Sequence, residues 1–580
     1  MSITLHGVGV SRGIAIGRLH ILERDKLDIP EYGIKAKEVD TEITRLDIAL
    51  EIAREQLCAV REHIPRGVSS DIADFIDAHL LMLNDSLLIN EAGRLIKKQR
   101  CNAEWALKLL YDSLVSVFDQ MADPYLKTRK DDIYHVVYRI QRVLLNQAPM
   151  RHEIPDSRLR GYIILAEDLT PADAVLMQHH GIAAFATEGG GPTSHTAILA
   201  RSLGIPSIVG LHEARCYAQE DDLAIIDGAN GVVLIAPDEK TLAHYKKRQQ
   251  ADKRHYAKLI TLKEKPTVTQ DGIVIELSAN IELPGDFAAV REVGARGVGL
   301  YRTEFMYMNR ETPPDEEEHY HTYAEVLRAL DNRPVTIRTF DLGADKQTLG
   351  GKQEVNAPLN PALGLRAIRL CLRKPALFRP QLRAILRVSA LGPVRLMIPM
   401  LSSVGELKQV LQIVDEIKTE LRSQNMAFDP NLAIGAMIEV PAAAVCADAF
   451  ARQADFLSIG TNDLIQYAIA IDRLNEEVNY LYDPMHPGVL RLIRMTIEAG
   501  RKAGTPVAMC GEMAGDPRFV RLLLGLGLRE FSVHPAVLLE VKHIIGESRI
   551  ETLEPLALKA LGSEDSSMIL KLLQGTAGNR

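Results

Sequence analysis

The sequence predicts a multidomain α/β protein whose C-terminal half is a (β/α)8 barrel of the TIM type. The chain has 580 residues, more than one hydrophobic core supports, which predicts about three or four domains. Beyond residue 267, eight short apolar segments alternate with helical stretches, as expected for a closed parallel barrel. Between residues 34 and 147, the apolar residues instead recur with helical spacing, which predicts an inserted helical unit.

The expected barrel strands are the eight short apolar segments of the C-terminal half. They cover residues 273–280, 297–302, 335–340, 394–399, 433–439, 456–460, 507–510 and 531–533. Each has the length of a strand, and helical patterns separate them. A doubly wound sheet is the alternative architecture, but no G-x-G-x-x-G turn follows the first segment.

The N-terminal half predicts a helical unit inserted into an α/β unit. After a glycine-punctuated apolar start ending near Leu22, two helical hairpins account for residues 36–64, 70–98, 102–121 and 129–147. Short apolar runs then follow at residues 162–166, 183–186, 207–209, 223–227 and 231–235. The expected domains are an α/β domain of residues 1–33 and 148–236, a helical insert at 34–147, a helical linker at 237–266 and the barrel at 267–580.

Composition and charge disfavour several classes of protein. Hydrophobic residues make up 47% of the chain and charged residues 25%, so neither disorder nor a fibrous repeat is expected. The net charge of -8 argues against a general binder of nucleic acid or anionic membranes. Six scattered cysteines without a C-x-x-C pair indicate neither a disulfide framework nor a zinc knuckle. With no signal-like start and no run of about 18 apolar residues, we expect no membrane insertion and a cytoplasmic location.

Charged residues gather where the predicted barrel strands end, which is the edge where such barrels carry their active sites. The cationic and polar side chains at these ends are Arg302, Arg338, Lys346, Arg366, Asn462, Asp463 and Arg473. Converging arginines suit a small, multiply charged anion, because guanidinium groups match carboxylate and phosphate geometry. Any one of these arginines could instead pair with a barrel acid for structural reasons.

A metal site and a proton donor are expected at the same edge. Glu439 and Asp463 end neighbouring predicted strands, and their hard carboxylate oxygens favour Mg²⁺. Cys510 follows the seventh predicted strand. A lone cysteine usually belongs to the packed core, but beside a cationic pocket its thiol could donate a proton.

A glycine-rich segment, ATEGGGPTSHTAILAR, places His195 at the start of a predicted helix. Gly189 to Gly191 allow close backbone approach, and Thr193 or Ser194 can cap the helix. The free N–H groups of the first helical turn favour an anion, so a phosphoryl group on His195 would be stabilised there. The alternative is a histidine satisfied within the core.

The segment GGGPTSHTAILARSLGIPSIVG resembles the phosphohistidine signature of enzyme I of the bacterial phosphoenolpyruvate-dependent phosphotransferase system. The same family is matched, in order, by GVGLYRTEF, IRT-x-D-x-G-x-DK, NP-x-LG-x-RAIR, E-x-PAAA, SIGTNDL-x-QY and MCGE-x-AGD. The likeness begins at residues 9–17 and reaches the last predicted strand. It implies a swivelling phosphohistidine α/β domain, an inserted carrier-binding helical subdomain, a helical linker that permits a swing, and a barrel that forms a homodimer.

The resemblance also implies an activity. His195 would accept the phosphoryl group of phosphoenolpyruvate, releasing pyruvate, and pass it to a histidine of the phosphocarrier HPr, the first step of sugar phosphotransfer. Phosphoenolpyruvate would be bound by Arg302, Arg338, Lys346, Arg366, Asn462, Asp463 and Arg473. Mg²⁺ would be held by Glu439 and Asp463, and Cys510 would protonate the departing enolate. The carrier would contact the helix around FIDAHLLMLND, at Asp74, Asp77, His79, Leu81 and Met82.

Two positions depart from the family pattern. Pro192 stands where many sugar-system members have arginine, and His534 replaces a small polar residue in the last strand. The loss of the arginine could mark a paralogue that feeds a nitrogen-regulatory carrier. That branch often has an extra N-terminal sensory domain, which we do not expect because the chain starts at the enzyme I motif.

Two other functions are disfavoured by the sequence. Pyruvate phosphate dikinase and phosphoenolpyruvate synthase share these modules but need a nucleotide-binding domain, and the chain has no P-loop. A non-catalytic scaffold that senses phosphoenolpyruvate is the remaining alternative. The joint presence of His195, Glu439, Asp463 and Cys510 argues against it.

Overall fold

The computed structural model describes most of both halves of the chain. The described residues are 2–22, 27–62, 76, 79–83, 86–119, 124–145, 159–169, 181–190, 197, 200, 204–282, 286–307, 312–342, 361–472 and 478–577. The chain forms two units, Met1–His255 and Tyr256–Arg580, whose boundary falls inside helix α8 (Glu239–Ile260). The finer division into four domains stays a prediction. No helix among the described residues combines the length and apolar character needed to cross a membrane.

The first unit contains an eight-stranded sheet with the order β1-β8-β7-β3-β4-β5-β6-β2. Its strands are β1 (Ile3–His6), β2 (Val8–Ser11), β3 (Ile14–Leu22), β4 (Ile163–Ala166), β5 (Ala184–Thr187), β6 (Ser207–Val209), β7 (Leu223–Asp227) and β8 (Val232–Ile235). Strands β3 and β4 are parallel neighbours, with Leu19 opposite Ile163, although the helical insert separates them in sequence. The insert therefore leaves and re-enters the sheet between adjacent strands.

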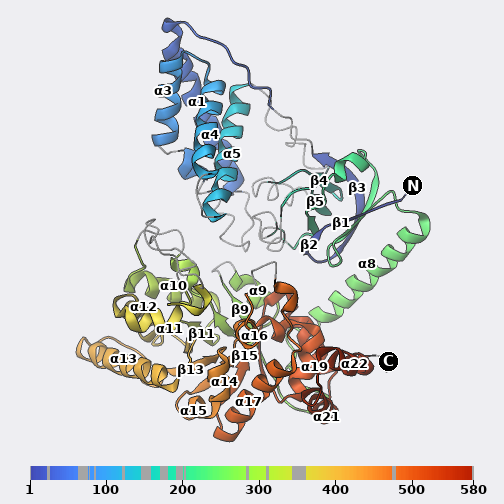
Figure 1. The fold of residues 1–580 in the computed structure, drawn as a ribbon, viewed down its shortest axis with the longest axis vertical. Coiled ribbons are helices and arrows are strands. Elements are labelled where there is room, and N and C mark those ends of the chain that lie inside the picture. Colours follow the sequence, from blue (N-terminus) through green and yellow to red (C-terminus); the bar gives the residue numbers. More distant parts are fainter. Residues whose placement is uncertain are drawn as a thin grey trace. The chain divides into compact units, whose positions relative to one another are not determined.

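The helical insert of the first unit is a bundle (Figure 1). Its helices are α1 (Val39–Glu62), α3 (Ser86–Gln99), α4 (Ala103–Asp119) and α5 (Pro124–Leu144), and residues 79–83 are also helical. The core uses one apolar stripe from each helix, with Leu57, Ile96, Leu107 and Ile140 at most 1% exposed. The helices predicted at 36–64, 102–121 and 129–147 correspond to α1, α4 and α5, and α3 covers the end of the helix predicted at 70–98, part of which lies outside the described residues.

The second unit is built on a closed parallel barrel, as the sequence predicted. Its strands are β9 (Glu276–Ile281), β10 (Val298–Tyr301), β11 (Val335–Arg338), β12 (Val394–Ile398), β13 (Ala433–Ile438), β14 (Phe456–Ile459), β15 (Val507–Met509) and β16 (Glu530–Val533). Strand β16 pairs with β9 and closes the barrel, with Phe531 opposite Leu277. Inside the barrel, Leu300, Met397 and Met437 form a small core together with Phe456 and Cys510.

Helices surround the barrel strands (Figure 1). They are α9 (Phe287–Glu292), α10 (Glu316–Ala329), α11 (Ala367–Arg373), α12 (Pro375–Val388), α13 (Val404–Ser423), α14 (Pro441–Val445), α15 (Ala447–Ala451), α16 (Thr461–Ile469), α17 (Pro487–Ala503), α18 (Glu512–Gly515), α19 (Pro517–Gly525), α20 (Pro535–Gly546), α21 (Ile550–Leu561) and α22 (Ser566–Ala577). Helix α12 buries Gln381, Leu382 and Ile385. Its Arg383 and Arg387 pair with Glu316 of α10 at 2.6 and 2.7 Å, so these two helices are tied together by both apolar and ionic contacts.

Candidate active site

The predicted barrel residues within the described part of the chain lie together where the strands end. Arg302 directly follows β10, Arg338 is the last residue of β11, and Glu439 directly follows β13. Asp463 lies in the first turn of α16 after β14, and Cys510 directly follows β15. Because all eight strands are parallel, these positions share the carboxyl end of one barrel.

Arg338 is a buried cation held by two carboxylates. Its Nη2 lies 2.9 Å from Glu304 Oε1, and its Nη1 lies 3.5 Å from Asp341 Oδ2. Burial opposes the charge, but Glu304 and Asp341 outweigh this effect and raise the pKa of Arg338 above its usual value. The guanidinium is therefore a fixed positive charge at the end of β11.

Arg366 links the end of β11 to the end of β14. Its Nε and Nη2 donate to Asp341 Oδ1 at 3.1 and 2.9 Å, and Nη2 lies 4.0 Å from Asp463 Oδ2. Its Nη1 lies 3.5 Å from the hydroxyl of Tyr467. Burial works against the charge, but Asp341 and Asp463 raise the pKa of Arg366 above its usual value, so this residue also stays charged.

Arg302 is the cation of the cluster that remains most accessible. Its side chain is 33% exposed and forms an ion pair with Glu282, which is largely exposed. Burial and the nearby positive charge of Arg338 lower the pKa of Arg302. Since the two guanidinium groups repel each other, a bound anion between them would relieve that repulsion.

Glu439 is a buried carboxyl group with too little positive charge around it. Its Oε1 accepts the backbone N–H of Met400 at 2.6 Å. Burial, with the nearby Asp463 and Asp341 carboxylates, raises the pKa of Glu439 to about 8, against the opposing effect of Arg338. A divalent cation would relieve this crowding of carboxylates, so Glu439 and Asp463 fit the donor set expected for Mg²⁺.

Among the described residues, protein ligands alone would not complete such a metal site. In the described ranges, no group of three or more His, Cys, Asp or Glu side chains is arranged to hold a metal ion. A cation bound by Glu439 and Asp463 would therefore take its other ligands from water and from an anionic substrate, as Mg²⁺ commonly does.

Cys510 carries a protonated thiol among apolar side chains. It is 3% exposed. The Ser458 hydroxyl donates to its sulfur at 3.3 Å, and the thiol donates to the Ile459 carbonyl at 3.8 Å. Burial raises the pKa of Cys510, although the Ser458 hydroxyl opposes this effect. The thiol is therefore available as an acid at neutral pH.

Polar groups at the ends of β14 and β15 are joined by Asn462. Its Nδ2 donates to Glu512 Oε1 at 2.8 Å, and its Oδ1 accepts the backbone N–H of Glu512 at 2.9 Å. Thr461 Oγ1 beside Asn462, and Thr339 Oγ1 and Arg338 Nε at the end of β11, are buried atoms with no hydrogen-bond partner among the described residues. Buried polar atoms rarely stay unpaired, so a polar ligand at the strand ends would account for them.

The segment leading toward His195 is shaped by β5. Gly190 has a φ of +88°, a conformation that favours glycine. The Gly189 N–H donates to the Glu167 carbonyl at 2.9 Å, and Glu188 is held by the backbone N–H and the Nε of Arg215 at 2.7 and 2.9 Å. Gly189 and Gly190 thus follow the end of β5 in a hydrogen-bonded turn.

Five of the predicted site residues lie outside the described part of the chain: His195, Lys346, Arg473, Asp74 and Asp77. Of the predicted carrier contacts that are described, Leu81 is 71% exposed and Met82 is half-buried. His79 is buried, and its ring centroid lies 6.4 Å from that of His135 on α5.

Sequence reasoning missed the acids that organise the arginines. Asp341 and Glu304 bind Arg338, and Tyr467 and Glu512 hold the neighbouring loops. A signal was present, because Asp341 lies in IRT-x-D and Glu304 in YRTEF, both segments already singled out for their arginines. A barrel-end arginine that is buried needs an acidic partner, so the acids within two or three residues of it were the candidates.

Comparisons with known proteins agree with this arrangement. Family models described as "PEP-utilising enzyme, N-terminal", "PEP-utilising enzyme, mobile domain" and "PEP-utilising enzyme, PEP-binding domain" match residues 6–129, 159–231 and 256–550. A relative from Cupriavidus necator, named phosphoenolpyruvate-protein phosphotransferase, is 45% identical over 583 residues, covering 99% of this chain and 100% of its own length.

Relatives with the same name occur in Bacillus subtilis and Listeria monocytogenes. They are 41% identical over 577 residues and 40% identical over 574 residues, respectively, and each alignment covers 99% of both chains. These alignments cover nearly the full length of each protein, so they include both the barrel and the glycine-rich segment. The chain therefore belongs to the phosphoenolpyruvate-protein phosphotransferases, the enzyme I family of the bacterial phosphotransferase system.

Proposed function

We propose that this phosphotransferase binds phosphoenolpyruvate at the carboxyl end of its barrel and transfers the phosphoryl group to His195. The observation that carries this proposal is the convergence of Arg302, Arg338 and Arg366 beside Glu439 and Cys510 at one end of one barrel. Phosphoenolpyruvate carries a phosphate and a carboxylate. A cluster of fixed cations next to a thiol acid suits both its charge and its chemistry.

The arginines bind and orient the substrate in this proposal. Arg338 and Arg366 are held in place by Asp341 and remain charged, so they need no rearrangement to receive an anion. Arg302 can exchange its exposed partner Glu282 for a substrate oxygen, at little cost because that ion pair faces solvent. Asn462, Lys346 and Arg473 would complete the substrate contacts, as the family resemblance implies.

Glu439 and Asp463 would hold Mg²⁺ beside the substrate. Their crowded carboxylates fit a divalent cation, as the raised pKa of Glu439 indicates. When bound, the ion would neutralise charge on the substrate's phosphate and carboxylate oxygens. The arginines and carboxylates of the chain would fix where those oxygens lie.

The chemical step exchanges one phosphorus bond for another. An imidazole nitrogen of His195 attacks the phosphorus, a P–N bond forms, and the bond between phosphorus and the enol oxygen breaks. The leaving group is the enolate of pyruvate. The Cys510 thiol gives its proton to the methylene carbon of that enolate, which yields pyruvate, and the thiolate regains a proton from water. The neutral thiol required for this step is favoured by the buried position of Cys510.

The phosphoryl group would then pass from His195 to a histidine of an HPr-like phosphocarrier. The exposed Leu81 and the half-buried Met82 offer an apolar contact for that carrier on the helical insert. Asp74 and Asp77 would be further contacts, as the family resemblance implies, whereas the predicted contact His79 is only 4% exposed and is therefore not offered to a carrier in this structure. We also propose a homodimer through the barrel unit. Tyr480, Leu481 and Met568 expose apolar area there, on segments joined by a hydrogen bond from Ser566 to Asp483.

Labelling with radioactive phosphoenolpyruvate in the presence of Mg²⁺ tests the acceptor. We expect acid-labile, base-stable label on the wild-type protein and on His244→Ala, whose histidine is exposed on α8. We expect none on His195→Ala. Equal labelling of His195→Ala would overturn the assignment of His195. Absence of label on a folded wild-type protein would overturn the proposed transfer itself.

A further inference from the structure

Behind the arginine cluster, the buried side chain of Gln381 on α12 is bonded to two active-site loops at once. Its Oε1 accepts the backbone N–H of Phe340, two residues after Arg338, at 3.1 Å. Its Nε2 donates to the hydroxyl of Thr303, the neighbour of Arg302, at 3.0 Å. A backbone N–H can only donate, so the amide oxygen must face Phe340 and the amide nitrogen must face Thr303. The orientation of the amide is therefore fixed.

The direction of the next bond follows from this orientation. The Thr303 hydroxyl accepts a hydrogen from Gln381, so its own hydrogen is free to donate to the carbonyl of Arg338 at 3.0 Å. Thr303, the residue after Arg302, is thus hydrogen-bonded to the backbone of Arg338. Both Thr303 and Gln381 are 0% exposed, so water does not compete for these bonds.

A second branch holds the same loop further along the chain. Gln381 Nε2 also donates to the hydroxyl of Tyr323 on α10 at 3.0 Å, and Tyr323 can then donate to Nδ1 of His319, also 3.0 Å away. Nε2 of His319 lies 3.2 Å from the hydroxyl of Tyr307, in the short helix η4 (Glu304–Tyr307) that follows Arg302 and Thr303. The loop after β10 is therefore held by hydrogen bonds at two points, Thr303 and Tyr307.

We propose that Gln381 and Thr303 are positioning residues for phosphoenolpyruvate: together they set the spacing between Arg302 and Arg338. The inference rests on the proposed role of these two arginines as substrate ligands. Apolar packing is not directional, so it would stabilise the loops without fixing one spacing. A fully satisfied buried polar network is directional and favours a single arrangement. Positioning errors of about 1 Å are enough to weaken a site of this kind.

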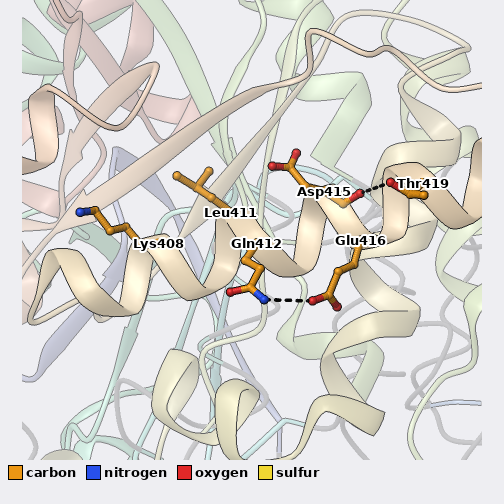
Figure 2. Close-up of a pocket in the computed structure, with 6 residues that line it drawn as sticks. All are labelled: Lys408, Leu411, Gln412, Asp415, Glu416 and Thr419. Carbon is orange, nitrogen blue, oxygen red and sulfur yellow. Dashed lines mark hydrogen bonds between the residues drawn. The ribbon is translucent and has the colours of Figure 1, made fainter.

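The hydroxyl of Thr303 provides the sharpest variants. Thr303→Val keeps the shape of the side chain but leaves the Arg338 carbonyl without its donor and one Gln381 N–H without its acceptor. Thr303→Ser restores the hydroxyl. Gln381→Met removes the amide that bonds to Phe340, Thr303 and Tyr323. Gln412→Met is the matched control, because the Gln412 amide lies on α13 and bonds only to Glu416 among the contacts in Figure 2, at 3.2 Å.

The measurement is the rate of protein labelling by radioactive phosphoenolpyruvate at increasing substrate concentration, in single-turnover reactions with Mg²⁺. We expect the half-saturating concentration to rise about tenfold in Thr303→Val and in Gln381→Met, the effect of losing roughly one buried hydrogen bond. Thr303→Ser and Gln412→Met should keep the wild-type value. A merely structural role would lower only the fraction of protein that becomes labelled and would leave the half-saturating concentration unchanged.

The outcomes separate this inference from the function on which it rests. A wild-type half-saturating concentration in folded Thr303→Val, while Arg338→Met raises it, would overturn the positioning role alone. If Arg338→Met also keeps the wild-type value, the proposed role of the arginine itself is wrong. A failure of Thr303→Ser to restore substrate binding would likewise refute the positioning role, since the hydroxyl is present.

Discussion

Replacing Arg338 by methionine should damage both stability and activity, and the two losses can be separated. Arg338 is 9% exposed, and its guanidinium lies 2.9 Å from Glu304 and 3.5 Å from Asp341. Asp341 keeps Arg366 as a partner in the variant, but Glu304 loses its only cation among the described ion pairs. Leaving one buried carboxylate uncompensated costs about 3 kcal/mol. For the second unit, Tyr256–Arg580, that corresponds to a fall in Tm of about 4 °C.

The second substitution, Glu304→Gln, removes the uncompensated charge. Its amide oxygen can still accept the backbone N–H of Asp341, which Glu304 Oε1 accepts at 2.7 Å. The double variant should therefore recover about 2 kcal/mol of the lost stability. Its activity should not recover, because the substrate still lacks the charge-assisted bonds of Arg338, a loss of about 100-fold or more in the labelling rate.

Calorimetric Tm values and labelling by radioactive phosphoenolpyruvate would be measured on the wild type, both single variants and the double variant. Stability should rise from the single to the double variant while the labelling rate stays low. Recovery of activity together with stability would refute this expectation, because Arg338 would then act only as a structural partner of Glu304. A single variant with the Tm of the wild type would refute the ion-pair argument.

Three further predictions concern other parts of the molecule. Cys510→Ser keeps the side-chain shape but not the acidity, so pyruvate release, followed with lactate dehydrogenase, should slow by about 100-fold or more, whereas the exposed Cys446→Ser should match the wild type. Burial raises the pKa of Glu104, but bonds from Arg45 and Asn102 outweigh it and lower that pKa below its usual value. The stabilising effect of this ionised carboxylate is therefore present above about pH 4.3 and is lost as the pH falls through the lower folded pKa. In urea unfolding followed by the single tryptophan, Glu104→Gln should be less stable than the wild type at pH 7 by about 1.5 kcal/mol, because the remaining Arg45 is partly exposed and keeps its pair with Glu42. The gap should close below about pH 4, and a constant gap would contradict the ion pair. Leu81→Glu should slow transfer to HPr about tenfold and leave labelling of the protein unchanged, and an unchanged transfer rate would remove Leu81 from the carrier surface.

The barrel was predictable because each strand leaves a local mark in the sequence. A run such as residues 433–439 is apolar at nearly every position, since a parallel strand is buried on both faces, and the structure places β13 at Ala433–Ile438. The first strand is less well marked. The segment 273–280 was expected, and β9 spans Glu276–Ile281, because the polar ends of a short run do not define where pairing begins.

The order of strands in the first unit could not be derived from the sequence. Strand β3 pairs with β4 on one side and β7 on the other, so neighbours in the sheet are separated by the helical insert in one case and by most of the α/β unit in the other. Periodicity reports which face of a segment is buried, but not which segment lies beside it. Pairing depends on long-range contacts, which single-segment patterns do not contain.

Some residues of the candidate site were likewise predictable from the sequence, and others were not. The arginines were predictable because their position at strand ends is local information, and their charge limits what they can bind. Of their acidic partners, Asp341 lies only three residues after Arg338 and was within reach of the sequence. Glu304 was not, because it is adjacent to Arg338 only once β10 and β11 pair, with Val298 opposite Val335. For the same reason the role of Gln381 could not be predicted. In the sequence it is an ordinary polar residue of a helix, and its contacts exist only once α12 packs behind those strands.

The most direct test of the central claim is a crystal structure of the full chain carrying His195→Ala, grown with phosphoenolpyruvate and Mg²⁺. We expect the substrate at the carboxyl end of the barrel, with its phosphate or carboxylate oxygens within hydrogen-bond distance of Arg302 and Arg338 and the metal on Glu439 and Asp463. Phosphoenolpyruvate bound elsewhere on the chain, with the Arg338 pairs to Glu304 and Asp341 unchanged and no ligand beside them, would contradict that claim.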